Sequence, residues 1–241
     1  MTALAALFWG GFCSSALYIG EALAGPMRKE YKAVGLIMAF GAGTLLSAVA
    51  YELVPDSLLS QGWGWGLAFG AGAAVYYVGD WYIDGRGGHQ RQEIAEAEEG
   101  SGMAMFLGAL LDGVPESFVL GISIQLGGEL SVAFVVAVFV SNIPQGIAGT
   151  TSLLDTGHTS HQVFRMWTLL TVACALTAWL GYLVADGVGS GGVYAQAFAG
   201  GAVLTMLADS MMPEAFRHGG RLVGVFTALG YAVAALLGVI G

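Results

Sequence analysis

The stretch Asp112-Gly113-Val114-Pro115-Glu116-Ser117 places two carboxylates and a proline inside a long apolar segment. A second stretch, Ser141-Asn142-Ile143-Pro144-Gln145-Gly146, follows the same plan 29 positions later. A proline removes one backbone hydrogen bond from a helix, and a charged side chain at the centre of a bilayer costs roughly 2.5–3.5 kcal/mol on insertion scales. Because such groups are expensive there, they usually mark a pathway through the membrane. The two stretches therefore indicate both the fold class and a candidate site.

The composition around these stretches is that of a membrane protein. Of the 241 residues, 56% are hydrophobic and 10% are charged, whereas soluble domains carry about 25% charged residues; the mean hydropathy is +0.72. Runs of about 20 apolar residues predict an all-α polytopic membrane protein, with a single transmembrane domain over residues 1–241. The eight predicted helices span residues 2–24, 34–58, 63–83, 104–126, 130–153, 165–186, 192–215 and 221–241. The first run lacks a basic start and an Ala-x-Ala-like cleavage site, so we interpret it as a retained helix.

The basic residues predict how the helices are oriented. Cytoplasmic loops of membrane proteins collect Lys and Arg. With eight spans, all eight basic residues fall on one side: Arg28, Lys29, Lys32, Arg86, Arg91, Arg165, Arg217 and Arg221. The sequence therefore predicts a multi-pass protein of the cytoplasmic membrane with both termini outside.

One long hydrophilic segment, a predicted cytoplasmic loop at about 84–103, interrupts the apolar runs. It carries part of the net charge of −9 in Glu93, Glu96, Glu98 and Glu99. A solvated flexible linker is the simpler interpretation, and weak metal capture is the alternative. No polybasic cluster indicates a nucleic-acid partner. Cys13 and Cys174 each lie within an apolar run, where a buried free thiol is expected.

A second internal repeat relates the first and last thirds of the chain. Ala39-Phe40-Gly41-Ala42-Gly43 through Pro55-Asp56-Ser57 aligns without gaps to Ala197-Phe198-Ala199-Gly200-Gly201 through Pro213-Glu214-Ala215, at a constant offset of 158. The two copies lie in spans that are expected to run in opposite directions, as in transporters built from inverted repeats. The sequence therefore predicts a 3+2+3 arrangement, with helices 1–3 and 6–8 as inverted repeats around a central pair.

Acidic and amide side chains are expected at three depths. The outer pair is Glu52 and Asp56, the inner pair is Asp209 and Glu214, and the central group is Asp112, Glu116, Asn142 and Gln145. Oxygen donors replace lost hydration around a cation, so the series predicts an entrance, a central site and an exit for a divalent cation. Simple solvation at the interface is an equal alternative for the outer and inner pairs. Glu21 and Asp80, near inner helix ends, are expected at the interface.

In the central group, Asp112 and Glu116 are four residues apart and share one helix face. Their repulsion must be relieved by a bound cation, by protonation of one carboxylate, or by hydrogen bonds from Ser141, Asn142 and Gln145. Ser141 and Gln145 have the same spacing, so two polar stripes can face each other. These five residues form the predicted metal site, and a structural polar latch is the alternative interpretation.

The two proline motifs resemble those of the ZIP family of divalent metal transporters. In that family each of two central helices has a polar residue that is followed, after two other residues, by Pro and then Glu or Gln. The family has eight helices in a 3+2+3 arrangement, with a long cytoplasmic loop after the third span. The resemblance covers essentially the whole chain. It implies that a metal ion, usually zinc, binds between helices 4 and 5 as the transported substrate, with no separate cofactor, and that the protein is a homodimer in the lipid bilayer.

The family's motifs are typically His-Asn-x-Pro-Glu-Gly in the fourth span and a similar motif ending in Pro-Glu-Gly in the fifth. The matching residues here are Asp112, Gly113 and Glu116, followed by Ser141, Asn142 and Gln145. Neutral Gln145 stands where the family has a bridging glutamate, which argues against a binuclear site. The oxygen-dominated donor set suits Mg²⁺, Mn²⁺, Fe²⁺ or Co²⁺ and still accepts Zn²⁺.

The expected function is therefore divalent-metal transport and not catalysis, since the sequence has no phosphate loop, nucleotide motif or catalytic triad. Two alternatives stay open. A non-transporting ZIP-like sensor or scaffold with a decayed metal site is favoured by Gln145. An intramembrane enzyme that uses Asp112 and Glu116 as acid and base is disfavoured by the lack of histidine within the predicted spans.

Overall fold

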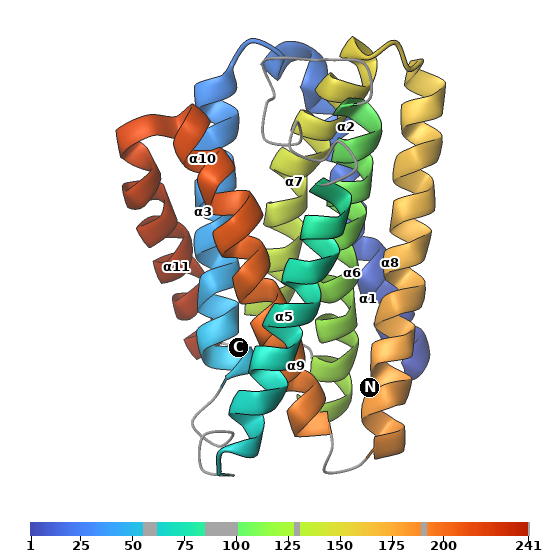
Figure 1. Ribbon diagram of the computed structural model, residues 1–241, viewed down its shortest axis with the longest axis vertical. Helices are drawn as coiled ribbons and strands as arrows, with labels where there is room; N and C mark the ends of the chain where they lie inside the picture. Colours follow the sequence, from blue (N-terminus) through green and yellow to red (C-terminus); the bar gives the residue numbers. More distant parts are fainter. Residues whose placement is uncertain (55–61, 85–100, 128–130, 189–191, 241) are drawn as a thin grey trace.

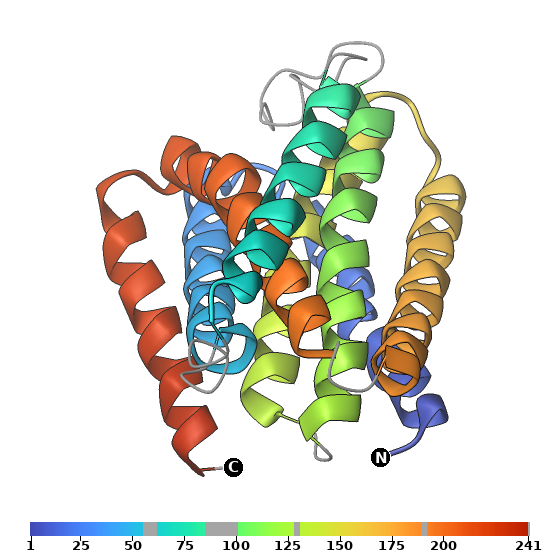
Figure 2. The ribbon, with the colours of Figure 1, turned by 60° about the horizontal axis from the view of Figure 1, so that its bottom comes forward.

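The chain folds into a bundle of long helices, seen from two directions in the computed structural model of Figures 1 and 2. The structure describes residues 1–54, 62–84, 101–127, 131–188 and 192–240. The α-helices are α1 (Ala3–Ser14), α2 (Ala16–Met27), α3 (Tyr31–Ala48), α5 (Gly64–Asp84), α6 (Ser101–Gly127), α7 (Val132–Asp155), α8 (Ser160–Val188), α9 (Gly192–Met206), α10 (Met212–Gly219) and α11 (Val223–Ile240). Two π-helical segments, η1 (Val49–Leu53) and η4 (Leu207–Met211), and one 3-10 turn, η5 (Gly220–Leu222), adjoin them. The all-helical prediction is confirmed for the described residues, which contain no strand.

Six described helical segments are long and apolar enough to cross a membrane. They are Ala3–Met27, Tyr31–Leu53, Phe106–Leu126, Val132–Asp155, Ser160–Asp186 and Gly192–Val239. The last of these runs from α9 into α11, and α5 falls outside the set because its glycines, tyrosines and Asp80 lower its hydropathy. The structure therefore supports a helical membrane protein, while the count of eight spans stays a prediction.

One end of the bundle collects the described basic residues, and we call it the basic end. The α2–α3, α7–α8 and α10–α11 connections lie at this end, and both termini lie toward the opposite end (Figures 1 and 2). The connections and adjoining turns hold Arg28, Lys29, Lys32, Arg165, Arg217 and Arg221. Arg86 and Arg91 lie outside the described residues. Arg28 forms an ion pair with Asp155, which joins the end of α2 to the end of α7.

Helix backbones approach very closely at glycines that the sequence repeat relates. A Cβ on Gly43 of α3 would overlap the carbonyl oxygen of Thr227 in α11, and a Cβ on Gly201 of α9 would overlap that of Phe69 in α5. Residues 43 and 201, like residues 69 and 227, differ by the same 158 positions. The offset of 158 positions also relates two further close contacts, one between Gly72 and Phe198 and the other between Gly230 and Phe40. The contacts of α3 with α11 and of α5 with α9 therefore have matching geometry.

The two π-helical segments also lie at equivalent places in the repeat. η1 begins at Val49 and η4 begins at Leu207, again 158 positions apart, and they carry Glu52 and Asp209, respectively. Single π-helical turns inside α-helices are frequent at functional sites. Irregular backbone in this fold therefore coincides with acidic side chains.

We expect Gly72→Ala to destabilise the protein by about 1–3 kcal/mol, because the added methyl group must push α5 away from the backbone of α9. Gly70→Ala is the matched control, since a Cβ at Gly70 meets no atom within 4 Å and Ala is the better helix former. Thermal unfolding of both variants in one detergent measures the difference. Equal unfolding midpoints would show that α5 and α9 can separate at no cost and that their contact is loose.

Candidate functional site

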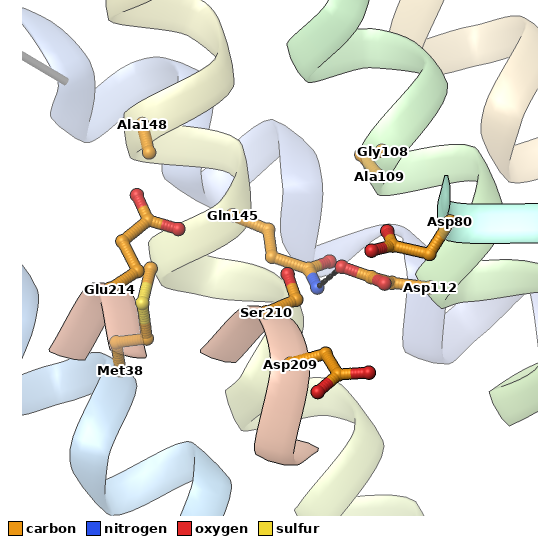
Figure 3. A pocket seen from close by; sticks show the side chains of 10 residues that line it. All are labelled: Met38, Asp80, Gly108, Ala109, Asp112, Gln145, Ala148, Asp209, Ser210 and Glu214. Carbon is orange, nitrogen blue, oxygen red and sulfur yellow. Dashed lines mark hydrogen bonds between the residues drawn. The ribbon is translucent and has the colours of Figure 1, made fainter. Parts of the chain in front are cut away.

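A small cavity lies inside the bundle, on the basic side of its centre. It has a volume of about 40 Å³ and is lined by Met38, Asp80, Gly108, Ala109, Asp112, Gln145, Ala148, Asp209, Ser210 and Glu214 (Figure 3). These residues come from α3, α5, α6, α7, η4 and α10. Each of them lies in the half of its helical segment that is nearer the basic end. The described residues that line the cavity include four carboxylates and no basic side chain.

Asp112 is held in a fixed orientation at the cavity wall. Its side chain is buried, the Tyr76 hydroxyl donates a hydrogen bond of 2.5 Å to Oδ1, and Gln145 Nε2 donates one of 3.2 Å to Oδ2. Each carboxylate oxygen therefore has a donor, from α5 on one side and from α7 on the other. Two donors from separate helices therefore fix the orientation of the Asp112 carboxylate inside the bundle.

Gln145 presents an amide oxygen that is still available. Its Nε2 is occupied by Asp112, while its Oε1 is buried and has no hydrogen-bond partner among the described residues. Buried polar atoms are nearly always paired with a protein group, a water or an ion. The amide oxygen of Gln145 is therefore a natural acceptor for water or a ligand for a cation in the cavity.

The other three carboxylates of the cavity come from separate elements. Asp80 is on α5, Asp209 on η4 and Glu214 on α10. In Figure 3 Asp80 and Asp112 extend toward Gln145 from one side, the carboxylate of Asp209 is directed away from Gln145, and Glu214 lies on the other side of Gln145. Asp80 lies four residues from the end of α5, and its side chain is buried where α5 packs against α6 and α9, so its position at the membrane interface stays a prediction.

The remaining residues of the predicted central group do not line this cavity. Glu116 is fully buried, and neither of its carboxylate oxygens has a hydrogen-bond partner among the described residues. Ser141 Oγ and Asn142 Nδ2 both donate to the carbonyl oxygen of Val138 in their own helix, over 2.9 and 2.7 Å. The predicted group is therefore divided between Asp112 and Gln145 at the cavity and three buried residues outside it.

Glu52, the described member of the predicted outer pair, lies away from this cavity; Asp56 lies outside the described residues. Glu52 borders a separate cavity of about 270 Å³ between α3, α7 and α11. Ser131 Oγ donates a hydrogen bond of 2.8 Å to its carboxylate, and Gln196 Nε2 donates to its backbone carbonyl oxygen. These contacts tie η1 to the N-cap of α7 and to the second turn of α9, toward the end opposite the basic end.

The cavity has the chemistry of a site for a hard cation. Carboxylate, amide and hydroxyl oxygens are the ligands that Mg²⁺, Mn²⁺ and Ca²⁺ prefer. Among the described residues, no three His, Cys, Asp or Glu side chains are close enough to hold a metal ion directly. A volume of about 40 Å³ has room for about three water molecules. The geometry therefore suits a partly hydrated cation whose waters bridge to the carboxylates.

No protein-family model matches this chain, and a search of curated proteins finds no match.

Sequence reasoning missed Tyr76 and Asp80 as site residues. The two are four residues apart and so share a helix face, and that spacing is the signal that would have found them. Both cysteines, by contrast, are buried and free as predicted.

We expect Tyr76→Phe to lower the free energy of unfolding by about 1–3 kcal/mol, because Asp112 stays buried and loses a donor. Tyr77→Phe is the matched control, since Tyr77 is the neighbouring residue and its side chain is 58% exposed. Thermal unfolding of both variants measures the effect. A Tyr76→Phe variant as stable as the control would contradict a structural role for this hydrogen bond.

Proposed function

We propose that the chain is a permease for divalent metal ions, similar to the ZIP family in its motifs and helix arrangement. The observation that carries the proposal is the cavity in which carboxylates from α5, α6, η4 and α10 surround the amide of Gln145. Buried carboxylates inside an apolar bundle are costly and are usually retained for ion pathways. The cargo is a substrate, and no resident cofactor is part of the proposal.

The proposed membrane arrangement has eight spans in a 3+2+3 order, with α1–α2, α3 and α5 related to α8, α9–α10 and α11 around the central pair α6 and α7. The matching glycine contacts and the matching π-helical segments support it, because both follow the offset of 158. The gathering of described Lys and Arg at one end supports a cytoplasmic basic end and external termini. The ZIP resemblance adds the expectation of a homodimer.

We further propose that this conformation is the one in which the carboxylate cavity is reached from the cytoplasmic side. The carboxylate cavity lies on the basic side of Asp112, while the opposite side is held together by the contacts of Glu52 with Ser131 and Gln196. The π-helical turns η1 and η4 are natural places for the backbone to adjust. Rocking of the two triplets against α6 and α7 would open the Glu52 side and close the basic side, as in other transporters with inverted repeats.

The route of the ion follows from this geometry. A divalent cation enters past Glu52 and Asp56, loses part of its hydration at Asp112 and Gln145, and leaves past Asp80, Asp209 and Glu214. In the alternate state Glu116, Ser141 and Asn142 would join the central site, as the motifs predict. The ion moves down its own gradient or with the membrane potential, since the sequence carries no nucleotide motif.

A second candidate is a ZIP-like membrane sensor or scaffold that binds a metal ion without moving it. Neutral Gln145 at the position of a family glutamate favours this alternative. Metal binding by the purified protein together with the absence of flux across a sealed membrane would support it.

We expect Asp112→Asn combined with Asp209→Asn to lower the initial rate of divalent-metal uptake at least about tenfold, because removing the charge of two ligands costs more than about 1.4 kcal/mol of binding. The measurement is uptake of Mn²⁺, Zn²⁺, Co²⁺, Fe²⁺, Cd²⁺ and Mg²⁺ by the purified protein in proteoliposomes. Asp186→Asn is the matched control, since Asp186 is exposed near the far end of α8 and bonds to Gln125.

Saturable uptake that is lost in the double variant and kept in the control would support the permease. Equal uptake by wild type and double variant would contradict it. The absence of uptake of any ion by folded wild-type protein would favour the sensor or scaffold.

A further inference from the structure

A surface groove at the basic end has no part in the proposed pathway. It has a volume of about 730 Å³ and is lined by Met103, His158, His161, Gln162, Phe164, Arg165, Met166, Thr168, Leu169 and Val172. Apart from Met103 of α6 and His158 before α8, all these residues are on α8. None of them lines the carboxylate cavity. The groove is therefore a separate feature of the surface.

The part of the groove nearest the basic end is cationic and open. The side chains of His161 and Arg165 are exposed, and neither has a hydrogen bond or ion pair with the described residues. His158 is half-buried beside them, with Nδ1 in contact with the carbonyl oxygen of Leu153. Arg165 is always charged at physiological pH. A positive charge that no described carboxylate pairs with, beside two imidazoles, attracts an anion.

The part of the groove farther along α8 is apolar. Leu169 and Val172 are 64% and 50% exposed, and they follow Arg165 on the same face of the helix, one and two turns away. At 1.5 Å per residue, Val172 lies about 10 Å deeper than Arg165. The groove therefore changes from cationic at the end of the bundle to apolar at a depth where the bilayer is hydrocarbon.

We infer that this groove binds one anionic phospholipid, with its phosphate at His161 and Arg165 and an acyl chain along Leu169 and Val172. Basic pockets beside transmembrane helices on the cytoplasmic side attract anionic head groups, each Lys or Arg contributing to the affinity. A soluble phosphate would use the cationic part and leave the apolar part exposed. The order of the two parts along α8 matches the order of head group and chain in a lipid leaflet. The inference rests on membrane insertion with the basic end at the head groups, and is independent of metal transport.

A second groove provides an internal comparison. It has a volume of about 530 Å³, and residues such as Val75, Val114 and Phe198 give it an almost wholly apolar lining, with no basic side chain among the described residues. Acyl chains that enter this groove have no charged partner there. Lipids bound at the second groove should therefore show no preference for an anionic head group.

The test is native mass spectrometry of the full chain in detergent, titrated with phosphatidylglycerol or with phosphatidylcholine of the same acyl chains. We expect wild type to bind the first phosphatidylglycerol at least about fivefold more tightly than phosphatidylcholine. The double variant His161→Gln/Arg165→Gln is expected to bind both lipids equally. Arg221→Gln, which removes an exposed positive charge from the same end of the bundle, is the matched control and should keep the preference.

Two more measurements distinguish a bound lipid from a bound soluble anion. Val172→Trp fills the apolar part of the groove and should weaken phosphatidylglycerol binding while leaving the charges intact. Excess inorganic phosphate should fail to displace the lipid, and efficient displacement would show an anion site without a lipid. Equal affinity of wild type for the two lipids, or an equal loss in the Arg221→Gln control, would overturn the inference.

Discussion

Contact between helix backbones at glycine is the constraint on which the rest of this bundle depends. Hydrocarbon provides no hydrophobic force between helices, so membrane helices associate through close packing and hydrogen bonds. Gly43 and Gly201 let α3 approach α11 and α9 approach α5 until backbone carbonyls lie against α-carbons. These contacts fix the rotation of α5 and α9 about their axes. That rotation brings Asp80 and Asp209 to the same cavity.

The cavity places negative charge where water is scarce, and the surrounding donors make this possible. Asp112 receives one hydrogen bond from Tyr76 and one from Gln145, so its orientation is set before any ion arrives. A preorganised carboxylate binds a cation without the cost of reorienting. In the proposed transport cycle the same hydrogen bonds couple α5 and α7 to the occupied site. An ion bound at Asp112 would then affect the positions of α5, in one outer triplet, and of α7, in the central pair.

The sequence predicted the membrane class, the helical fold and the proximity of Asp112 to Gln145, because these follow from composition, from apolar runs and from the spacing of polar residues. It did not predict that Asp80 is buried, since depth along a helix says nothing about which face of that helix meets its neighbours. It also grouped Glu116 with Asp112, one turn away. The cavity lies on the basic side of Asp112, whereas Glu116 lies one turn, about 5.4 Å, in the other direction along α6. Glu116 is therefore outside the cavity. The rotation of a helix and the shape of a cavity depend on packing between segments that are distant in the sequence. Local sequence patterns do not predict that packing.

The most direct test of a cation site at this cavity is anomalous X-ray diffraction from crystals of the protein grown with Mn²⁺ or Cd²⁺. We expect an anomalous peak in the space bounded by Asp80, Asp112 and Asp209, with direct or water-mediated contact to Asp112 and to the amide oxygen of Gln145. The peak should be lost in crystals of Asp112→Asn. An ordered crystal structure of this same form with an empty cavity at saturating metal, or with metal bound only elsewhere, would contradict a cation site between these carboxylates.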